Sequence, residues 1–209
     1  MNITKLAEKY ILNSPSVKNA LKKGLINYSS LARQIVKDNN LGKKNFDAVL
    51  IACRRYYQKI KLEASNEEKI LEILKKSKLE TKNKMMAVVL EKDIYMPNLI
   101  SIENSVKKQN GIFRIIEGAS AITLITSEEF LSEINKLFKN KIIRKNLSLV
   151  EVILKSPKEI ETTAGVISYV YSLFRENNIN IYETLSCWTD TLFLIQEKDF
   201  NRVMELLKF

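Results

Sequence analysis

Hydrophobic residues recur with the period of an α-helix along the first 77 residues of the chain. This spacing predicts helices over residues 4–12, 17–21, 27–36, 44–61 and 65–76. We expect Ser29 to cap the third helix, and Ser65 or Asn66 to cap the fifth, because these side chains accept hydrogen bonds from first-turn N–H groups. A turn over residues 39–42, rich in residues that tolerate positive φ, separates the third helix from the fourth. Two helices joined by a tight turn predict a helix-turn-helix unit, with or without an added wing.

The predicted helix over residues 44–61 has one apolar face when it is projected at 100° per residue. That face is formed by Phe46, Val49, Leu50, Cys53, Tyr57 and Ile60. Lys44, Arg55 and Lys59 lie on the opposite face, Arg54 lies on its flank, and Lys43 comes just before the helix. The pattern therefore predicts a helix that buries one side and presents cations on the other.

From about residue 78 onward the pattern is that of strands, and strands and helices then recur twice in the same order. The first copy has a strand ending near Leu90, a helix over 98–109, strands over 112–116 and 121–126, and a helix over 127–139. The second copy has a strand over 149–155, a helix over 165–176, strands over 179–184 and 192–197, and a helix over 199–207. This is the order of a ferredoxin-like fold, in which helices cover one face of an antiparallel sheet.

The fold class that we predict is α+β, with three domains. A helical domain spans residues 1–77, and two ferredoxin-like βαββαβ domains span residues 78–146 and 147–209. The second copy stops after its last helix, so its sheet lacks one strand from its own sequence. We expect Lys78–Asn83 to supply that strand, and Ile142-Ile143 to complete the first copy in the same way.

Composition excludes several classes of enzyme. The chain contains no His, two Cys and five Gly. Without His there is no Ser-His-Asp or Cys-His catalysis, and two distant Cys cannot form a tetrathiolate zinc site. No glycine-rich phosphate loop is present, and no apolar run approaches the roughly 20 residues that span a bilayer. We therefore expect a cytoplasmic protein that is not an enzyme, has no cofactor and does not enter a membrane.

The net charge of +10 is unevenly distributed. Residues 1–86 contain 19 Lys and Arg against 8 Asp and Glu, whereas residues 87–209 contain 15 against 16. Such asymmetry is typical of a unit that binds a polyanion. Lys43, Lys44, Arg54, Arg55 and Lys59 are the candidate DNA-binding residues. The alternative is that these cations are solvated, with Arg54 and Arg55 complementing the helix dipole.

The segments Ser156–Ile167, Asn178–Thr184 and Ser186–Thr191 resemble the ACT regulatory domain, in the tandem arrangement found at the C-terminus of aspartate kinases. The family has a loop ending in Pro-Gly-Val at a helix start, an Asn-Ile-Asn-Ile strand opening and a hairpin. This chain has Ala164 in place of the proline, and its first copy has no Gly-Val loop. The resemblance implies a module that binds a small amino acid, without kinase activity.

The resemblance also implies a set of effector residues. They are Thr163, Ala164, Gly165, Val166, Ile167, Glu183, Ser186, Thr189 and Asp190. Gly165 at a helix start can offer backbone N–H groups to the effector carboxylate. Glu183 or Asp190 could hold its ammonium group. Against this interpretation, Ser, Thr and Asp are also ordinary turn formers, and many ACT domains serve only for assembly.

These observations predict an amino-acid-responsive transcriptional regulator. Its N-terminal domain would bind DNA, and its ACT domains would bind a free amino acid and form a homodimer or a larger homo-oligomer through their sheets. The alternative is a non-catalytic regulatory subunit that docks on an amino-acid biosynthetic enzyme. The sequence does not specify the amino acid, the operator or the direction of regulation.

Overall fold

The computed structural model describes residues 2–61 and 66–209 of the 209-residue chain. The chain divides into two compact units, residues 1–65 and residues 66–209. The predicted domain boundary after residue 77 therefore lies inside the second unit. The reason is that the helix predicted to end the first domain packs against residues that follow it in the sequence.

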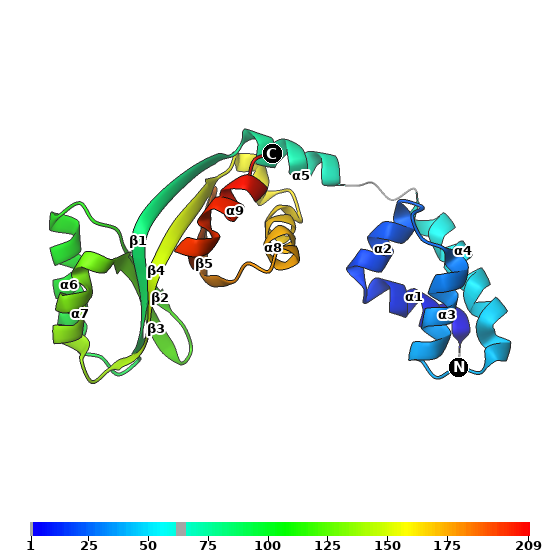
Figure 1. Ribbon diagram of the computed structural model, residues 1–209, viewed down its shortest axis with the longest axis horizontal. Coiled ribbons are helices and arrows are strands. Elements are labelled where there is room, and N and C mark those ends of the chain that lie inside the picture. Colours follow the sequence, from blue (N-terminus) through cyan, green and yellow to red (C-terminus); the bar gives the residue numbers. More distant parts are fainter. Residues whose placement is uncertain (1, 62–65) are drawn as a thin grey trace. The chain divides into compact units, whose positions relative to one another are not determined.

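The first unit consists of helices around a single core. Its elements are α1 (Ile3–Leu12), α2 (Pro15–Lys22), α3 (Tyr28–Asp38), the 3₁₀ helix η1 (Lys43–Asn45) and α4 (Phe46–Ile60) (Figure 1). Its buried side chains are Ala7, Ile11, Leu21, Leu31, Ala32, Ile35, Val49, Ala52, Cys53, Tyr56 and Ile60. Residues 2–61 contain no strand, so this part of the unit has no wing.

The N-cap of α3 is Asn27, not Ser29 as the sequence suggested. The Asn27 side-chain oxygen accepts a hydrogen bond from the backbone N–H of Ser30 at 3.0 Å. Ser29 lies within the first turn of the helix. Asn66 occupies the N-cap position of α5 (Glu67–Lys76), and the other predicted cap, Ser65, lies outside the described residues.

The buried face of α4 is rotated slightly from the predicted one. Val49, Cys53 and Ile60 are buried as expected, but the face also includes Ala52 and Tyr56. The other three predicted members, Phe46, Leu50 and Tyr57, are only partly buried. The rotation leaves the cations of the opposite face in solvent.

The second unit contains one six-stranded antiparallel sheet. Its elements after α5 are β1 (Lys78–Glu91), α6 (Met96–Lys108), β2 (Phe113–Glu117), β3 (Ala121–Ser127), η2 (Glu128–Phe130), α7 (Leu131–Phe138), β4 (Ile142–Lys155), η3 (Lys158–Glu161), α8 (Val166–Glu176), β5 (Ile181–Cys187), β6 (Asp190–Gln196), η4 (Glu197–Asp199) and α9 (Phe200–Leu206). The strand order is β2-β3-β1-β4-β6-β5. Both ferredoxin-like copies therefore share one sheet, and the predicted division after residue 146 falls inside β4.

The two long central strands each serve both copies. Lys78 to Lys82 pair with Lys155 to Glu151, which completes the second copy, and Leu90 pairs with Ile142, which completes the first. This register confirms the predicted pairing of these two segments. Bulges interrupt the pairing between the copies, where Lys84 and Ser148 both have positive φ. Bulges of this kind bend and twist a strand, so one sheet can curl around two cores.

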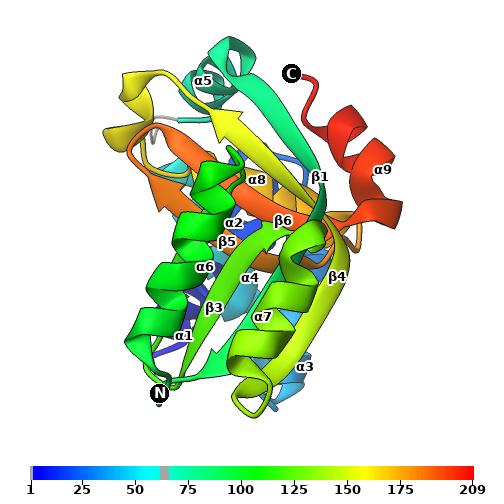
Figure 2. The ribbon, with the colours of Figure 1, turned by 90° about the vertical axis from the view of Figure 1, so that its left-hand side faces the viewer.

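Helices cover the sheet in two groups. Helices α6 and α7 lie side by side on the part that contains β1 and β3, as Figures 1 and 2 both show. Helices α5, α8 and α9 pack on the part formed by β4 and β6 through the largest hydrophobic cluster of the unit. Along the strands, the side chains that point away from the helices form a smaller cluster on the opposite face of the sheet. This cluster includes Met85, Ile125 and Leu194.

That other face also contains a buried ion pair. Glu151 of β4 is completely buried, and Arg114 of β2 donates hydrogen bonds to both of its carboxylate oxygens, at 2.6 and 3.2 Å. Two strands separate β2 from β4 in the sheet, so the arginine reaches across the curled face. The pair joins a strand of the first copy to the central strand that begins the second.

Candidate nucleic-acid interface and effector site

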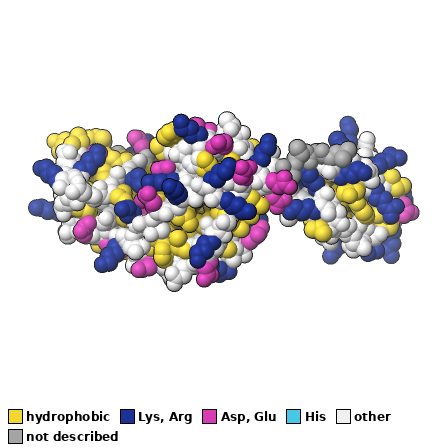
Figure 3. All heavy atoms as spheres, turned by 90° about the horizontal axis from the view of Figure 1, so that it is seen from above, with side chains coloured by type: hydrophobic (Ala, Val, Ile, Leu, Met, Phe, Trp, Pro, Cys, Tyr) yellow, Lys and Arg dark blue, Asp and Glu magenta, His cyan; other side chains and the backbone are white. Residues whose placement is uncertain are grey.

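The exposed face of α4 carries most of the cations that the sequence marked as DNA-binding. Arg54, Arg55 and Lys59 of α4 are all exposed, and so are Lys43 and Lys44 in η1, just before it. The helix can present them because its other side anchors it through Val49, Ala52, Cys53, Tyr56 and Ile60. The first unit contains 13 Lys and Arg against 4 Asp and Glu, whereas residues 66–209 contain 21 against 20. On the face of this unit seen in Figure 3, more of the surface is accordingly dark blue (Lys and Arg) than magenta (Asp and Glu).

Aromatic side chains support this cationic face. The Nζ of Lys59 lies 5.8 Å from the centre of the Tyr56 ring. Tyr57 packs edge-on against Tyr28 of α3, with ring centres 5.9 Å apart. Burial raises the pKa of Tyr28, and the positive charge of Arg54 acts in the opposite direction. Arg54 is therefore close to the start of α3, and the phenol stays neutral at physiological pH.

A groove of about 440 Å³ lies where α3 meets η1 and α4. It is lined by Arg33, Val36, Lys37, Lys43 and Phe46. Lys43 was predicted to bind DNA, but Arg33 and Lys37 were not. Their spacing in α3 placed both on one exposed side of that helix, and only the tertiary structure sets this side against Lys43.

Most of the predicted effector residues lie at one end of the second copy. Residues 163–167 lead into α8, and Ser186, Thr189 and Asp190 belong to the hairpin between β5 and β6. The backbone N–H of Ser156, at the end of β4, donates to the carbonyl oxygen of Thr189 at 2.9 Å, which holds the hairpin beside the segment that leads to η3. Lys158 of η3 lies over the ring of Trp188 at the hairpin tip, 5.6 Å from its centre.

Helix α5 covers this end of the molecule. Gly165 has φ +100°, and a Cβ added to it would lie 3.1 Å from Cδ1 of Ile70 in α5. At the other end of α5, the hydroxyl of Ser77 donates to the carbonyl of Ile73 and also bonds the hydroxyl of Ser156 at 3.0 Å. The helix thus contacts both the start of α8 and the segment that holds the hairpin.

Glu183 does not join the other predicted effector residues. It lies within β5, and its carboxylate accepts a hydrogen bond from the hydroxyl of Thr123 in β3 at 3.3 Å. This contact crosses the same face as the pair of Arg114 and Glu151. The sequence placed Glu183 near the hairpin, but the side-chain alternation of β5 directs it to the other copy of the repeat.

Another groove, of about 450 Å³, lies at the opposite end of α8. It is lined by Tyr171, Phe174, Arg175, Asn178, Ile179, Asn180 and Ile181. None of the nine predicted effector residues lines it. Asn178 to Ile181 form the Asn-Ile-Asn-Ile opening that contributed to the family resemblance.

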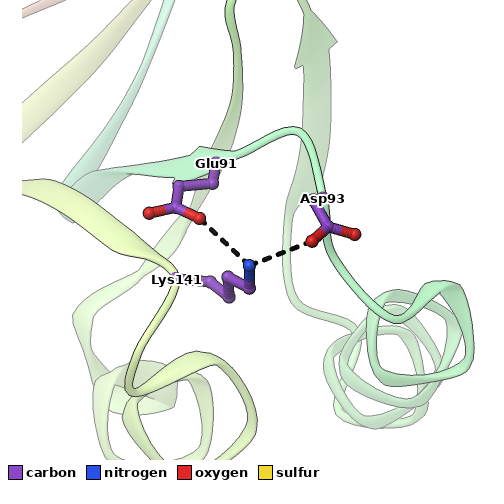
Figure 4. A network of polar contacts seen from close by, with 3 residues as sticks. All are labelled: Glu91, Asp93 and Lys141. Carbon is purple, nitrogen blue, oxygen red and sulfur yellow. Dashed lines mark hydrogen bonds and ion pairs between the residues drawn. The ribbon is translucent and has the colours of Figure 1, made fainter.

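In the first copy, residues 92–95 connect β1 to α6. They correspond to residues 156–165 of the second copy, which connect β4 to α8. Lys141, just before β4, donates to Glu91 at 3.1 Å and to Asp93 at 3.2 Å (Figure 4). These two hydrogen bonds raise the pKa of the Lys141 ammonium group. All three groups are at least one-third exposed, so the pairs contribute little stability. They tie the loop to the sheet.

Metal-binding clusters and reactive thiols were sought in the described part of the chain. No group of three or more His, Cys, Asp or Glu side chains among these residues could hold a metal ion. Burial raises the pKa of the Cys53 thiol to about 11, so it is protonated and unreactive at neutral pH. Within residues 2–61 and 66–209, no helix is long and apolar enough to cross a bilayer.

A scan of the sequence against protein-family models gave no match, and a search of curated proteins gave none either. Among solved structures, the aspartate kinase of Clostridium acetobutylicum matches with a TM-score of 0.50 at 13% identity. The match covers 62% of this chain but only 33% of the kinase chain, about a third of its length. The second unit has an ACT-like fold. This likeness, together with the doubled order of strands and helices, supports that statement for the fold alone.

Two smaller proteins give similar values. The regulatory subunit of aspartate kinase from Thermus thermophilus has a TM-score of 0.49 at 10% identity, over 62% of this chain and 92% of that one. Protein VC0802 from Vibrio cholerae, described as a possible transport protein, has a TM-score of 0.48 at 12% identity, over 68% and 96%.

Proposed function

We propose that this protein is a cytoplasmic, non-enzymatic transcriptional regulator that responds to an amino acid. Its first unit binds DNA, and its ACT-like unit binds the effector. The observation that carries the proposal is the row of exposed cations along α4, in a unit with a net charge of +9 that is joined to a nearly neutral ACT-like unit.

DNA binding at α4 is supported by size, charge and exposure. An α-helix with its side chains is 10–12 Å wide, which fits the major groove of B-DNA. Arg54, Arg55 and Lys59 would neutralise phosphates. Ile51 and Gln58 are also exposed and project from the same side of the helix, so they would face the bases. Affinity should then fall as the salt concentration rises, because each neutralised phosphate releases counterions.

Effector binding is assigned to the start of α8 and the neighbouring hairpin. The unpaired N–H groups of the first turn after Gly165 attract a carboxylate through the helix dipole. Asp190 is the remaining candidate for the ammonium group, because it lies at the hairpin, whereas the Glu183 carboxylate accepts a hydrogen bond from Thr123 of β3. Ser186 and Thr189 add hydrogen-bonding groups from the hairpin.

Helix α5 provides a route from effector to DNA. It contacts Gly165 through Ile70 and Ser156 through Ser77, and only residues 62–65 separate it in sequence from the last described residue after α4. An effector that prefers one position of these segments also prefers one position of α5. Coupling of this kind is reciprocal, so DNA would change the effector affinity by the same factor.

A homodimer would place two first units on two half-sites of DNA. The outer strands of the sheet, β2 and β5, each pair on one side only within the described chain. Open strand edges favour pairing with a second copy. Sedimentation at several protein concentrations would establish the oligomeric state.

The test of DNA binding is fluorescence anisotropy with a labelled duplex at several salt concentrations. The wild-type chain should bind at low salt and weaken as salt rises. In the double variant Arg54→Gln with Arg55→Gln, the negative slope of log affinity against log salt should become shallower by about 1.8. This change corresponds to two lost phosphate contacts. A matched variant, Lys5→Gln with Lys9→Gln in α1, removes the same charge elsewhere and should leave that slope nearly unchanged.

Two results would contradict the proposal. If the wild-type chain does not bind DNA at low salt, the DNA-binding assignment is wrong. If it instead co-purifies with a metabolic enzyme and shows no salt-sensitive nucleic-acid affinity, the alternative of an enzyme-docking regulatory subunit is favoured.

Effector binding is tested separately by thermal shift of the full chain with each of the twenty amino acids. One of them should stabilise the ACT-like unit by about 2.7 kcal/mol at a hundredfold excess over its dissociation constant. Asp190→Asn should abolish that shift. If none of the twenty stabilises the wild-type protein, effector binding is excluded for these compounds.

A further inference from the structure

We propose that the groove between α3 and α4 holds a sugar–phosphate backbone of the DNA that binds at α4. This inference rests on the proposed function and adds a second contact surface to it. The groove of about 440 Å³ presents three cations, Arg33 and Lys37 from α3 and Lys43 from η1. No carboxylate lines it.

The three cations are available to a ligand. Each is exposed, and no ion pair joins any of them to another described residue. Arg33 also donates a long hydrogen bond of 3.5 Å to the hydroxyl of Ser30. The groove therefore gathers three positive charges that form no ion pair among the described residues, and that of Lys37 also acts on the neighbouring Asp38.

The nearest acidic side chain in α3 is turned away from the groove. Asp38 accepts a hydrogen bond from the hydroxyl of Tyr10 in α1 at 2.6 Å, and two from the amide of Gln34 at 2.9 and 3.0 Å. On a helical projection, Gln34 and Asp38 lie on the side of α3 opposite Val36. These three hydrogen bonds hold the carboxylate at that side and lower its pKa, with a smaller contribution from the charge of Lys37.

The floor of the groove favours a nucleic-acid backbone over a small carboxylate. It is formed by Val36 and Phe46, which offer apolar surface between the charged rims. A deoxyribose can pack on such a floor while the phosphates on either side meet the cations. A single carboxylate would use one or two of the three charges and leave the floor exposed.

The groove is continuous with the exposed face of α4. Lys43 lines the groove, and the next residue, Lys44, begins the cationic row. Lys43 and Arg54 are eleven residues apart, which is roughly 16–18 Å along η1 and the first part of α4. That distance corresponds to about five nucleotides of one DNA strand at 3.4 Å each. One strand can therefore meet the groove while the helix lies against the bases.

The experiment compares two double variants of the full chain in salt titrations with the same labelled duplex. Arg33→Gln with Lys37→Gln empties the groove of two charges, and Lys5→Gln with Lys9→Gln removes the same charge from α1. Gln has a helix propensity close to that of Lys and Arg, and all four side chains are exposed, so each variant should keep the wild-type melting temperature. Circular dichroism checks this point.

The groove variant should bind at least tenfold more weakly at low salt. Its negative slope of log affinity against log salt should become shallower by about 1.8. The α1 variant should stay within about twofold of the wild type, because it loses no contact to DNA. A groove variant with the wild-type slope, or one no weaker than the α1 variant, would overturn the inference while leaving DNA binding at α4 intact. Stronger binding to single-stranded RNA than to duplex DNA would also overturn it.

If the wild-type chain itself does not bind DNA, the proposed function and the groove assignment are refuted together.

Discussion

Charged side chains of the second unit illustrate how strongly burial decides the value of an interaction. Glu151 is fully buried and is held by two hydrogen bonds from Arg114, whereas Glu80 and Lys155 form a pair in which both side chains are more than 40% exposed. Water screens the second pair and cannot reach the carboxylate of the first.

Glu151→Ala should therefore lower the free energy of unfolding by about 3 kcal/mol. The change leaves the charge of Arg114, on the face of the sheet opposite the helices, without a partner. We take the lower end of the expected range because Arg114 is 32% exposed. Glu80→Ala is the matched change and should cost at most about 1 kcal/mol. Urea titration of both variants measures the difference; equal losses would show that the buried pair has no special importance.

Gly165 is the glycine whose backbone conformation most clearly requires the absence of a side chain. Its φ is +100°, and an added Cβ would lie 3.1 Å from Ile70. Gly165→Ala should destabilise the ACT-like unit by about 1–2 kcal/mol, through backbone strain and displacement of α5. Gly118→Ala, where the Cβ meets its nearest neighbour at 3.4 Å, should have little effect in the same melting experiment. Equal melting temperatures for both variants would contradict the role given to the contact with α5.

At the scale of elements, the start of α3 shows how a local choice between two capping residues is resolved. The side chain of Asn27 bonds the N–H of Ser30, and Ser29 is already helical. Asn27→Ala should cost about 1 kcal/mol, whereas Ser29→Ala should cost no more than about 0.5 kcal/mol. Thermal unfolding of the two variants separates them, and a larger loss for Ser29→Ala would restore the cap expected from the sequence.

The sequence predicted the order of the elements and the two strand completions, because periodicity and the missing strand are local signals. It did not predict that α5 belongs to the second unit. The apolar stripe of α5 is formed by Ile70, Ile73 and Leu74. It indicates that one face of the helix is buried, but it does not indicate which other elements pack against that face. That information resides in the packing of residues far apart in the chain.

The candidate sites follow the same rule. The cations of α4 were predictable because one helical projection places them together. The groove that Arg33 and Lys37 line was not predicted, because it forms only where α3 and η1 meet. Glu183 was a candidate effector residue through the resemblance to ACT domains, but in the structure its carboxylate accepts a hydrogen bond from Thr123 of β3.

At the scale of the whole molecule, the hydrophobic clusters fall within one unit or the other. The core of the first unit contains residues from Ile3 to Ile60, and the other three clusters begin at Ile70 or later. A fragment of residues 66–209 should therefore fold and retain the melting transition of the ACT-like unit. A fragment of residues 78–209 lacks α5 and should melt at a clearly lower temperature. Calorimetry of both fragments checks this, and equal stability would refute the assignment of α5 to the second unit.

The central claim is that the basic first unit binds DNA on behalf of an ACT-like unit. The most direct measurement is the affinity of a labelled duplex for the full chain and for the folded 66–209 fragment, from low to physiological salt. The account predicts that the full chain binds with a steep salt dependence and that the fragment, with 21 basic and 20 acidic residues, does not bind detectably. Equal binding by both, or no binding by the full chain at low salt, would contradict it.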